Sequence, residues 1–274
     1  MVVYQPTTMT ETLATHSMTS DIGKPTSPPL SIMKLLTSFL ILFVASITLC
    51  LGDDAKLNLD DPSVRAAIEK KALDVHQVES RKENGQRLTY AINRQKPYTG
   101  WTKAYHGNAM LRYLCAFKDG KEDGLRTEFH ESGHKKEETN YLSGMSQGLS
   151  KSWYWNGHKK EEAELKDSRL NGLRTAWHQN GQVMEKYNYI NGYRHGLSNA
   201  WYESGQKKFE TYWKNHKWDG LATWWHQNGQ KSRETNYQEN KKHGLETRWD
   251  ENGKVTSKTN WVDGKKLVSP PASD

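Results

Sequence analysis

The chain has 274 residues and a net charge of +7, and only 34% of its residues are hydrophobic. Globular domains usually hold about 45–50% apolar residues, so this chain lacks the aliphatic residues that fill a thick core. Aromatic residues make up 11% of it, including 11 tryptophans, which excludes a plainly disordered chain because disordered segments are poor in aromatics. The composition argues against a doubly wound or barrel enzyme and favours a thin fold in which aromatic side chains supply most of the burial.

The charges are too evenly mixed to indicate a nucleic-acid-binding protein. There are 39 Lys and Arg residues against 32 Asp and Glu residues, and like charges form no run of five or six. We therefore expect no nucleic-acid partner, although the small excess permits weak attraction to anionic partners. The two cysteines, Cys50 and Cys115, give neither a disulfide framework nor the paired spacing of a zinc site.

Residues 33–52 are typical of a secretory signal peptide. Lys34 precedes an uncharged, apolar run over residues 35–51, and Asp53 follows the segment. The run has 17 residues, which is short for a membrane span of about 20 residues. We predict that cleavage leaves Asp53 at the new amino terminus and that the chain is exported to the periplasm, the cell envelope or the medium. An uncleaved anchor formed by residues 35–51, or a lipid on Cys50, is the alternative.

The segments on either side of the signal differ in character. Residues 1–32 are rich in Thr, Ser and Pro without a pattern, and we interpret them as a non-native or disordered extension before a true start at Met33. Residues 53–83 are predicted to be a linker with a short helix, which Asp61 caps and Pro62 begins. The helix either packs as a cap on the next domain or only links to it. Residues 269–274 are predicted to be a tail.

Residues 84–268 repeat one motif every 24 residues. A glycine marks position 0 of each unit, and a leucine follows it from the second unit on. An aromatic residue stands at position 5, a second glycine at position 9 from the second unit on, and an aromatic residue or leucine at position 17. This register holds without insertion, which indicates a repeat architecture. The position-0 glycines are Gly100, Gly124, Gly148, Gly172, Gly196, Gly220 and Gly244.

Each unit reads as a β-hairpin followed by a second turn. Side chains alternate with a period of two along residues 173–177, a turn at residues 179–181 follows, and residues 182–189 form the second strand. No proline lies between Pro97 and Pro270, as repeated strand pairing requires. We therefore predict an all-β fold: an elongated meander of about seven 24-residue hairpin repeats in a single twisted sheet, with a short N-terminal helix.

The turn type decides which side chains share a face. A three-residue turn at residues 179–181, with its glycine in the left-handed conformation, would place Trp177 and Tyr189 on one face. We predict this turn for both connections of every unit, in preference to the tighter primed turns. One face would then carry Leu, Thr and two aromatics per unit, and the other would carry Arg, Glu, Lys and Asn. The second turns that lack their glycine are expected to be looser; the replacing residues are Ser168, His216 and Asn240.

These residues resemble a known family. The pattern Gly-Leu-x-x-x-Trp-Tyr-x-Asn-Gly-Gln-Lys-x-x-Glu-x-x-Tyr-x-Asn-Gly is similar to the MORN-repeat variant of bacterial YwqK-like proteins, and residues 196–216 match it best. The segment 96–101 also resembles the start of such arrays. The resemblance covers about residues 84–268 and implies a row of hairpins that serves as an interaction surface. Some of these proteins are labelled antitoxins, but no residue here supports that activity, and an exported chain would be an odd antitoxin for a cytoplasmic toxin.

No pattern in the sequence predicts catalysis, a cofactor or a metal. His130, His178 and His226 occupy equivalent positions in alternate units, four strands or roughly 19 Å apart. Zinc ligands lie about 2.0–2.1 Å from one ion, so these histidines cannot converge on a metal. The glycines are spread along the chain and form no phosphate-binding loop. We therefore predict a protein that is not an enzyme.

Aromatic residues that the repeat does not require are the candidate partner-binding residues. Exposed Tyr and Trp are favoured in binding hot spots, although such rings also pack against Lys and Arg stems. Four of them have the parity predicted for the charged face: Tyr154, Tyr202, Tyr212 and Trp224. Two others are predicted to lie at turns: Trp155 and Trp218.

These observations predict an exported, non-enzymatic scaffold that binds another protein. The alternatives are a carbohydrate or cell-wall binder that stacks sugars on exposed rings, and a module that binds anionic lipid, whose attraction salt would screen. Membrane contact is otherwise expected only through an uncleaved signal segment. The sequence leaves open what covers the aromatic face. The alternatives are the curvature of the sheet itself, the helical segment 62–75 and a second chain.

Overall fold

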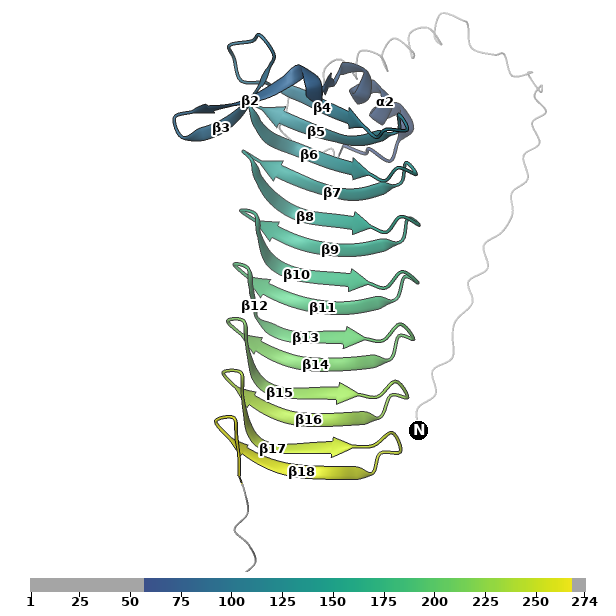
Figure 1. Cartoon of the computed structure of the whole chain (residues 1–274), viewed down its shortest axis with the longest axis vertical. Coiled ribbons are helices and arrows are strands. Elements are labelled where there is room, and N and C mark those ends of the chain that lie inside the picture. Colours follow the sequence, from purple (N-terminus) through teal and green to yellow (C-terminus); the bar gives the residue numbers. More distant parts are fainter. Residues whose placement is uncertain (1–56, 268–274) are drawn as a thin grey trace, which may run out of the picture. The chain divides into compact units, whose positions relative to one another are not determined.

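The computed structural model describes residues 57–267. The predicted extension 1–32, signal peptide 33–52 and tail 269–274 lie outside the described residues. The described chain forms a 17-stranded sheet and a separate two-stranded sheet, and Figure 1 shows the hairpins of the long sheet following one another in chain order. No helix within residues 57–267 is long and apolar enough to span a membrane.

The elements follow the predicted periodicity. The helices are α2 (Pro62–Lys71) and the 3₁₀-helix η2 (Val75–Gln77). The strands are β1 (Leu73–Asp74), β2 (Val78–Glu83), β3 (Gln86–Ala91), β4 (Gly100–Tyr105), β5 (Leu111–Lys118), β6 (Lys121–Phe129), β7 (Lys135–Leu142), β8 (Met145–Trp153), β9 (Lys159–Lys166), β10 (Arg169–Trp177), β11 (Val183–Ile190), β12 (Tyr193–Arg194), β13 (Gly196–Trp201), β14 (Lys207–Lys214), β15 (Lys217–Trp225), β16 (Lys231–Gln238), β17 (Lys241–Trp249), β18 (Val255–Val262) and β19 (Lys265–Lys266).

The long sheet is a meander of seven antiparallel hairpins. Each hairpin is one repeat unit: β4–β5, β6–β7, β8–β9, β10–β11, β13–β14, β15–β16 and β17–β18. Each unit also pairs with the next, as β5 does with β6 and β14 with β15. The predicted all-β array of about seven repeats is confirmed. β2 and β3 form the separate two-stranded sheet.

The first turn of each unit has the predicted three-residue form. In the β10–β11 hairpin the N–H of His178 donates to the carbonyl of Gln182 at 2.8 Å. The N–H of Gly181 donates to the carbonyl of His178 at 2.9 Å, and Gly181 has a φ of +86°. This is a type I turn closed by a glycine in the left-handed region.

The second turn of each unit differs from the prediction. Ile190 pairs with Tyr193, so only Asn191 and Gly192 form the loop, with φ values of +51° and +85°. Two central residues with positive φ make the primed turn that matches the right-handed twist of the strands. The expected three-residue loop is therefore wrong at this connection.

The turns that lack a glycine are not looser. Ser168, His216 and Asn240 have φ values of +60°, +66° and +70° in the same two-residue loop. Each side chain also accepts a hydrogen bond from a backbone N–H of the neighbouring unit, for example Asn240 Oδ1 from the N–H of Trp218 at 2.7 Å. This bond offsets part of the cost of a side chain in the left-handed region.

A β-bulge overturns the predicted distribution of side chains between the faces. Gly172 pairs with Tyr189 and Ala176 with Glu185, but Trp177 pairs with Val183. Met184 is therefore an extra residue beside the turn. Because a slip of one residue exchanges the two faces of a strand, Trp177 and Tyr189 lie on opposite faces.

The long sheet has two faces, which we call the leucine face and the tyrosine face. Partners in an antiparallel pair point to the same side, and neighbours along a strand point to opposite sides. The leucine face carries positions 1, 3 and 5; its leucines are Leu125, Leu149, Leu173, Leu197, Leu221 and Leu245. The tyrosine face carries positions 2, 4, 13, 15 and 17; its position-17 residues are Tyr141, Leu165, Tyr189, Trp213, Tyr237 and Trp261.

Helix α2 packs as a cap on the first units. The Asp61 carboxylate accepts a hydrogen bond from the N–H of Ser63 at 2.8 Å, which confirms the predicted N-cap, and Pro62 begins the helix. Apolar side chains of this segment pack on the leucine face; they are Leu57, Leu59, Val64, Ile68 and Ala72, and they contact Trp101, Leu111, Leu114 and Leu125. The helix is therefore a packed cap and not only a linker.

The first unit offers a simple test of the turn geometry. Ala109 stands where the other units have their turn glycine, and its φ is +62°. A left-handed conformation costs an ordinary residue about 1–2 kcal/mol, while glycine loses about 0.5–1 kcal/mol more backbone entropy on folding. We expect Ala109→Gly to raise the free energy of unfolding by about 0.5–1 kcal/mol, measured by urea denaturation. A loss of stability in this variant would contradict the assignment.

Candidate functional site

Side chains at position 6 tie each unit to the next. The Tyr154 hydroxyl donates to the carbonyl oxygen of Trp177 at 2.8 Å, and the Tyr202 hydroxyl donates to that of Trp225 at 2.7 Å. Each acceptor is the position-5 residue of the following unit. Both tyrosines are half-buried, so these two candidate binding residues have a structural role between units.

Histidines make the same connection in other units. Nε2 of each ring lies 2.9–3.1 Å from a position-5 carbonyl oxygen of the following unit. A carbonyl oxygen only accepts, so each ring carries a proton on Nε2. These histidines are His106, His130, His178 and His226.

The connection at Tyr154 can be tested by two substitutions at one position. We expect Tyr154→Phe to lower the free energy of unfolding by about 1 kcal/mol, because the carbonyl of Trp177 loses its donor. Tyr154→His should lose less, since histidine donates from this position in other units. Thermal and urea denaturation measure both; equal losses in the two variants would show that the hydrogen bond contributes nothing.

Two other candidate residues lie apart from each other. Trp155 is in a turn and its side chain is 66% exposed. Tyr212 is 50% exposed and pairs with Leu197, which places it on the leucine face. The predicted set of six residues therefore does not form one surface.

Position −2 is the residue two places before the first glycine of a unit. On the tyrosine face, the side chains at positions −2, 2, 4 and 13 of neighbouring strands lie close together. In the second unit Arg126, at position 2, contacts Glu122 at 3.3 Å and Glu128 at 2.6 Å. These charges form an ion-pair network across β6. A second network of the same kind joins β9, β10 and β11: Arg174, Glu161 and Glu185.

The last unit has a network of inverted charge. Glu246, at position 2, is 3% exposed, and Lys242 and Arg248 both pair with its carboxylate. Burial raises the pKa of the Glu246 carboxyl, but the hydrogen bonds and charges of Lys242 and Arg248 outweigh burial and hold that pKa below its ordinary value. This carboxylate is therefore ionised at neutral pH.

Between these networks the same positions hold aromatic rings. Phe209 is at position 13, Trp218 at position −2 and Trp224 at position 4, and their ring centroids lie 4.9–5.8 Å apart. Two position-17 rings complete the group: the centroid of Tyr237 lies 4.7 Å from that of Trp218, and that of Trp213 lies 5.7 Å from it. We call these five residues the aromatic cluster. It lies on β14, β15 and β16.

Two arginines accompany the aromatic cluster. The Arg233 guanidinium lies 3.4 Å from the ring centroid of Trp224, and that of Arg194 lies 4.9 Å from the ring of Trp213. Nε1 of Trp213 and Nε of Arg233 are buried, and neither has a hydrogen-bond partner among the described residues. Buried donors are nearly always paired, but these two are closed off from solvent and are not open to an incoming acceptor.

Two of the five residues of the aromatic cluster were named from the sequence. Trp218 and Trp224 are candidate residues that the structure brings together, although Trp218 lies within β15 and not at a turn. Phe209, Trp213 and Tyr237 were missed, because the parity of positions 13 and 17 placed these rings on the other face. If the alternation of side chains is counted with one extra residue just after the first turn, these three rings fall on the same face as Trp224.

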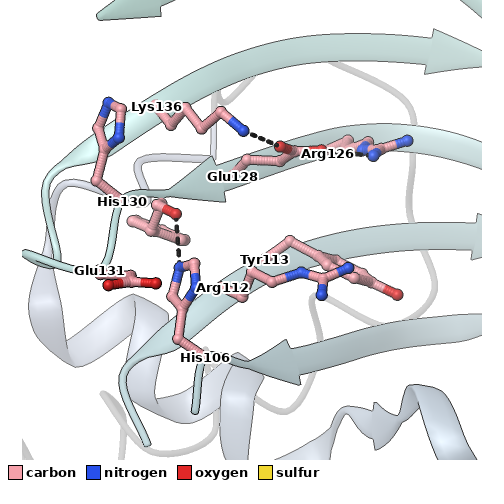
Figure 2. A pocket seen from close by; sticks show the side chains of 9 residues that line it. His106, Arg112, Tyr113, Arg126, Glu128, His130, Glu131 and Lys136 are labelled. Atoms are coloured by element: carbon pink, nitrogen blue, oxygen red, sulfur yellow. Dashed lines mark hydrogen bonds and ion pairs between the residues drawn. The ribbon is translucent and has the colours of Figure 1, made fainter. Parts of the chain in front are cut away.

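A polar hollow of about 340 Å³ lies beside the first turns of the β4–β5 and β6–β7 hairpins. Figure 2 shows the Lys136 ammonium directed at the Glu128 carboxylate, with Arg126 beside it; the Lys136–Glu128 distance is 3.5 Å. The residues around the hollow are His106, Arg112, Tyr113, Arg126, Glu128, Phe129, His130, Glu131 and Lys136.

Several charges in this hollow satisfy one another. Burial raises the pKa of the Glu128 carboxyl, but the hydrogen bond and charge of Arg126, with the charge of Lys136, hold it below its ordinary value. Burial lowers the pKa of Arg126, and its contacts with Glu128 and Glu122 raise it above the ordinary value on balance. Neither group is suited to exchange a proton near neutral pH.

Comparison with known families identifies the repeat. The family described as MORN repeat variant matches five segments, each beginning at position −2 of a unit: 122–142, 170–191, 194–215, 218–239 and 242–263. The chain is a MORN-repeat protein. No curated protein matches its sequence, so the finer resemblance to YwqK-like proteins stays a prediction.

Two units of this MORN-repeat protein lie outside the matched segments. Residues 100–118 and 145–166 nevertheless form the hairpins β4–β5 and β8–β9, with the same bulge just after the first turn. Their turns also carry the position-6 connections from His106 and Tyr154. The geometry of the repeat therefore continues through all seven hairpins of the long sheet, including the two that the family model does not match.

Within residues 57–267 no group of three or more His, Cys, Asp or Glu side chains is placed to hold a metal ion. Cys115 is buried, and burial raises the pKa of its thiol, which keeps it protonated and unreactive. The aromatic cluster is the part of the described surface that departs most from the repeat, and it is our candidate binding site.

Proposed function

We propose that this MORN-repeat protein is a non-enzymatic scaffold that binds another protein through the aromatic cluster. One observation carries the proposal. Positions −2, 4 and 13 hold members of ion-pair networks in other units, but here they hold three aromatic rings. The fold does not require that exchange, because the Arg174 and Glu246 networks fill the same positions in other units.

The chemistry of the cluster favours a protein partner. Trp, Tyr and Arg are the residue types most enriched in protein-binding hot spots, and the cluster combines all three. Its five rings are half-buried, so part of each ring faces solvent.

The surroundings of the cluster resemble those of a hot spot. The Arg174 network lies on β9–β11 and the Glu246 network on β17, so charged networks stand on both sides of β14–β16. A polar border around buried aromatic anchors excludes water from the contact. The position-6 connections at Tyr202 and His226 fix the hairpins on which the rings stand, which reduces the entropy lost on binding.

A photo-crosslinking experiment tests this proposal without unfolding the site. A photoreactive phenylalanine analogue replaces Trp218, and the matched control replaces Leu170, which occupies the same position −2 two units earlier. We expect the full-length chain to crosslink one protein of the source cells from position 218 and not from position 170. Equal crosslinking from both positions, or none from position 218, would overturn the proposal. Retention on glycan or on anionic vesicles that Trp224→Ala abolishes would replace it with the carbohydrate or the lipid alternative.

We also propose that the scaffold is exported. The support is the sequence of residues 33–52, which lie outside the described residues. Mass spectrometry of the chain purified from its source cells should find Asp53 at the amino terminus. A chain that retains residues 35–51 would favour the membrane-anchored alternative.

A further inference from the structure

The last full strand of the long sheet has an open edge. One side of β18 pairs with β17 from Val255 to Trp261. Its other side pairs with β19 only at Trp261 and Val262, and one further bond joins the N–H of Leu267 to the carbonyl of Asn260 at 2.9 Å. No described residue pairs with the outer side of residues 255–259.

The other end of the sheet is covered. β1 pairs with β4 in parallel, at Leu73 and Asp74. Helix α2 packs against the same first hairpins on the leucine face. The described sheet therefore offers an extended edge at its carboxyl-terminal end, and an unpaired edge is a template for another strand.

The sequence departs from the repeat after the described residues. The residue 24 positions after Gly244 is Val268, and position 3 of this unfilled unit is Pro271. In earlier units position 3 pairs with the preceding strand, as Thr247 does with Glu234. Proline has no N–H and cannot donate to a sheet ladder, so residue 271 departs from the sequence pattern of the earlier units.

The open edge also differs from the inner strands in charge. In four inner strands a lysine at position 11 pairs with a glutamate at position 14, as Lys231 does with Glu234. In β18 these positions hold Val255 and Lys258. Lys258 is exposed and takes part in no ion pair among the described residues. Three further lysines lie close to it along the chain: Lys254, Lys265 and Lys266.

We propose that the outer edge of β18 binds an extended, acidic segment of a partner protein, which adds to the sheet as its next strand. Backbone groups of residues 255–259 supply the affinity, and a carboxylate opposite Lys258 supplies the specificity. A second copy of this chain fits less well, because antiparallel pairing of two β18 strands gathers their Lys258 side chains. This inference rests on the strand edge and not on the aromatic cluster.

A peptide taken from the chain itself is a suitable probe. Residues 243–251 with Thr247→Glu form an acidic strand whose new carboxylate corresponds to the position opposite Lys258. The matched control is the same peptide with Thr247→Lys. By fluorescence anisotropy at low ionic strength, we expect the full-length protein to bind the Glu peptide at least tenfold more tightly than the Lys peptide. Equal affinities would overturn the proposal.

Two further arms separate strand addition from charge attraction. Lys258→Glu is an exposed substitution and should reverse the preference between the two peptides, which also shows that the variant is folded. The Glu peptide with alternate backbone amides methylated should not bind, because it cannot donate to the edge. Undiminished binding of the methylated peptide would overturn strand addition.

The same reagents detect the other occupants of the edge. A dimer in sedimentation whose formation blocks binding of the Glu peptide would assign the edge to a second copy of the chain. Peptide binding by a chain that ends at Leu267, together with none by the full-length chain, would assign it to the chain's own tail. Either result would overturn the proposal.

Discussion

Replacing Trp218 with alanine is expected to lower the free energy of unfolding by about 3 kcal/mol. Trp218 is the central ring of the aromatic cluster and contacts Phe209, Trp213, Trp224 and Tyr237, with centroids 4.7–5.8 Å away. Its half-buried state puts the loss at the low end of the range of about 3–5 kcal/mol for Trp→Ala in protein cores. In a single-layer sheet these contacts replace the core that a second layer would provide. Urea denaturation followed by far-UV circular dichroism measures the change.

Trp155→Ala is the matched control for this prediction. Trp155 is a tryptophan in the same repeat array, but its side chain is 66% exposed in a turn. Removing an exposed surface side chain changes stability by about 0.5 kcal/mol or less. A loss from Trp218→Ala no larger than that from Trp155→Ala would mean that the cluster does not stabilise the sheet.

Replacing Glu246 with glutamine is expected to lower the free energy of unfolding by about 2 kcal/mol at pH 7. The substitution keeps the shape of a side chain that is 3% exposed, but it leaves Lys242 and Arg248 without their counter-charge. Breaking a buried pair costs about 3–5 kcal/mol. The loss here is smaller, because the side chain of Arg248 is half exposed and can turn to water.

The loss caused by Glu246→Gln should depend on pH. The folded pKa of Glu246 lies below its ordinary value of 4.5, so the folded state binds fewer protons than the unfolded state near that pH. The stabilisation is therefore complete above about pH 4.5 and is lost as the pH falls through the folded pKa. Denaturation between pH 7 and pH 3 should show the wild type and the variant converging. The control is Glu251→Gln, an exposed substitution in the same hairpin; a pH-independent gap would contradict the assignment.

The family resemblance and the 24-residue period predicted the fold well. The spacing from Gly100 to Gly244 gave the number of hairpins, and the turn at residues 179–181 has the predicted geometry. The helix cap at Asp61 was also predicted correctly. These features are local, because each depends on residues only a few positions apart.

The distribution between the faces could not be predicted from alternation alone. The extra residue at Met184 has no distinctive sequence signal, yet it moves Trp177 and Tyr189 to opposite faces. A bulge next to a turn changes the parity of everything beyond it. The same error hid Phe209, Trp213 and Tyr237 as members of one cluster.

Two candidate residues show the limit of reasoning from exposure. Tyr154 and Tyr202 break the alternation, which suggested a binding role. Their hydroxyls instead donate to carbonyls 23 residues away, in the place that histidine takes in other units. In the β17–β18 hairpin the residue at this position is Asp250, which accepts from the N–H groups of Asn252 and Lys254 in its own turn.

The sequence by itself determined the repeat, the hairpins and the first turns, since glycine spacing and strand periodicity act over short distances. Only the tertiary structure decided which residues meet. Positions −2, 2, 4 and 13 converge because strands from neighbouring units pair across a bulge, and this pairing turns Trp218, Trp224 and Phe209 into one cluster. The open edge of β18 is likewise a feature of the tertiary structure, because it depends on how the strands of the sheet pair.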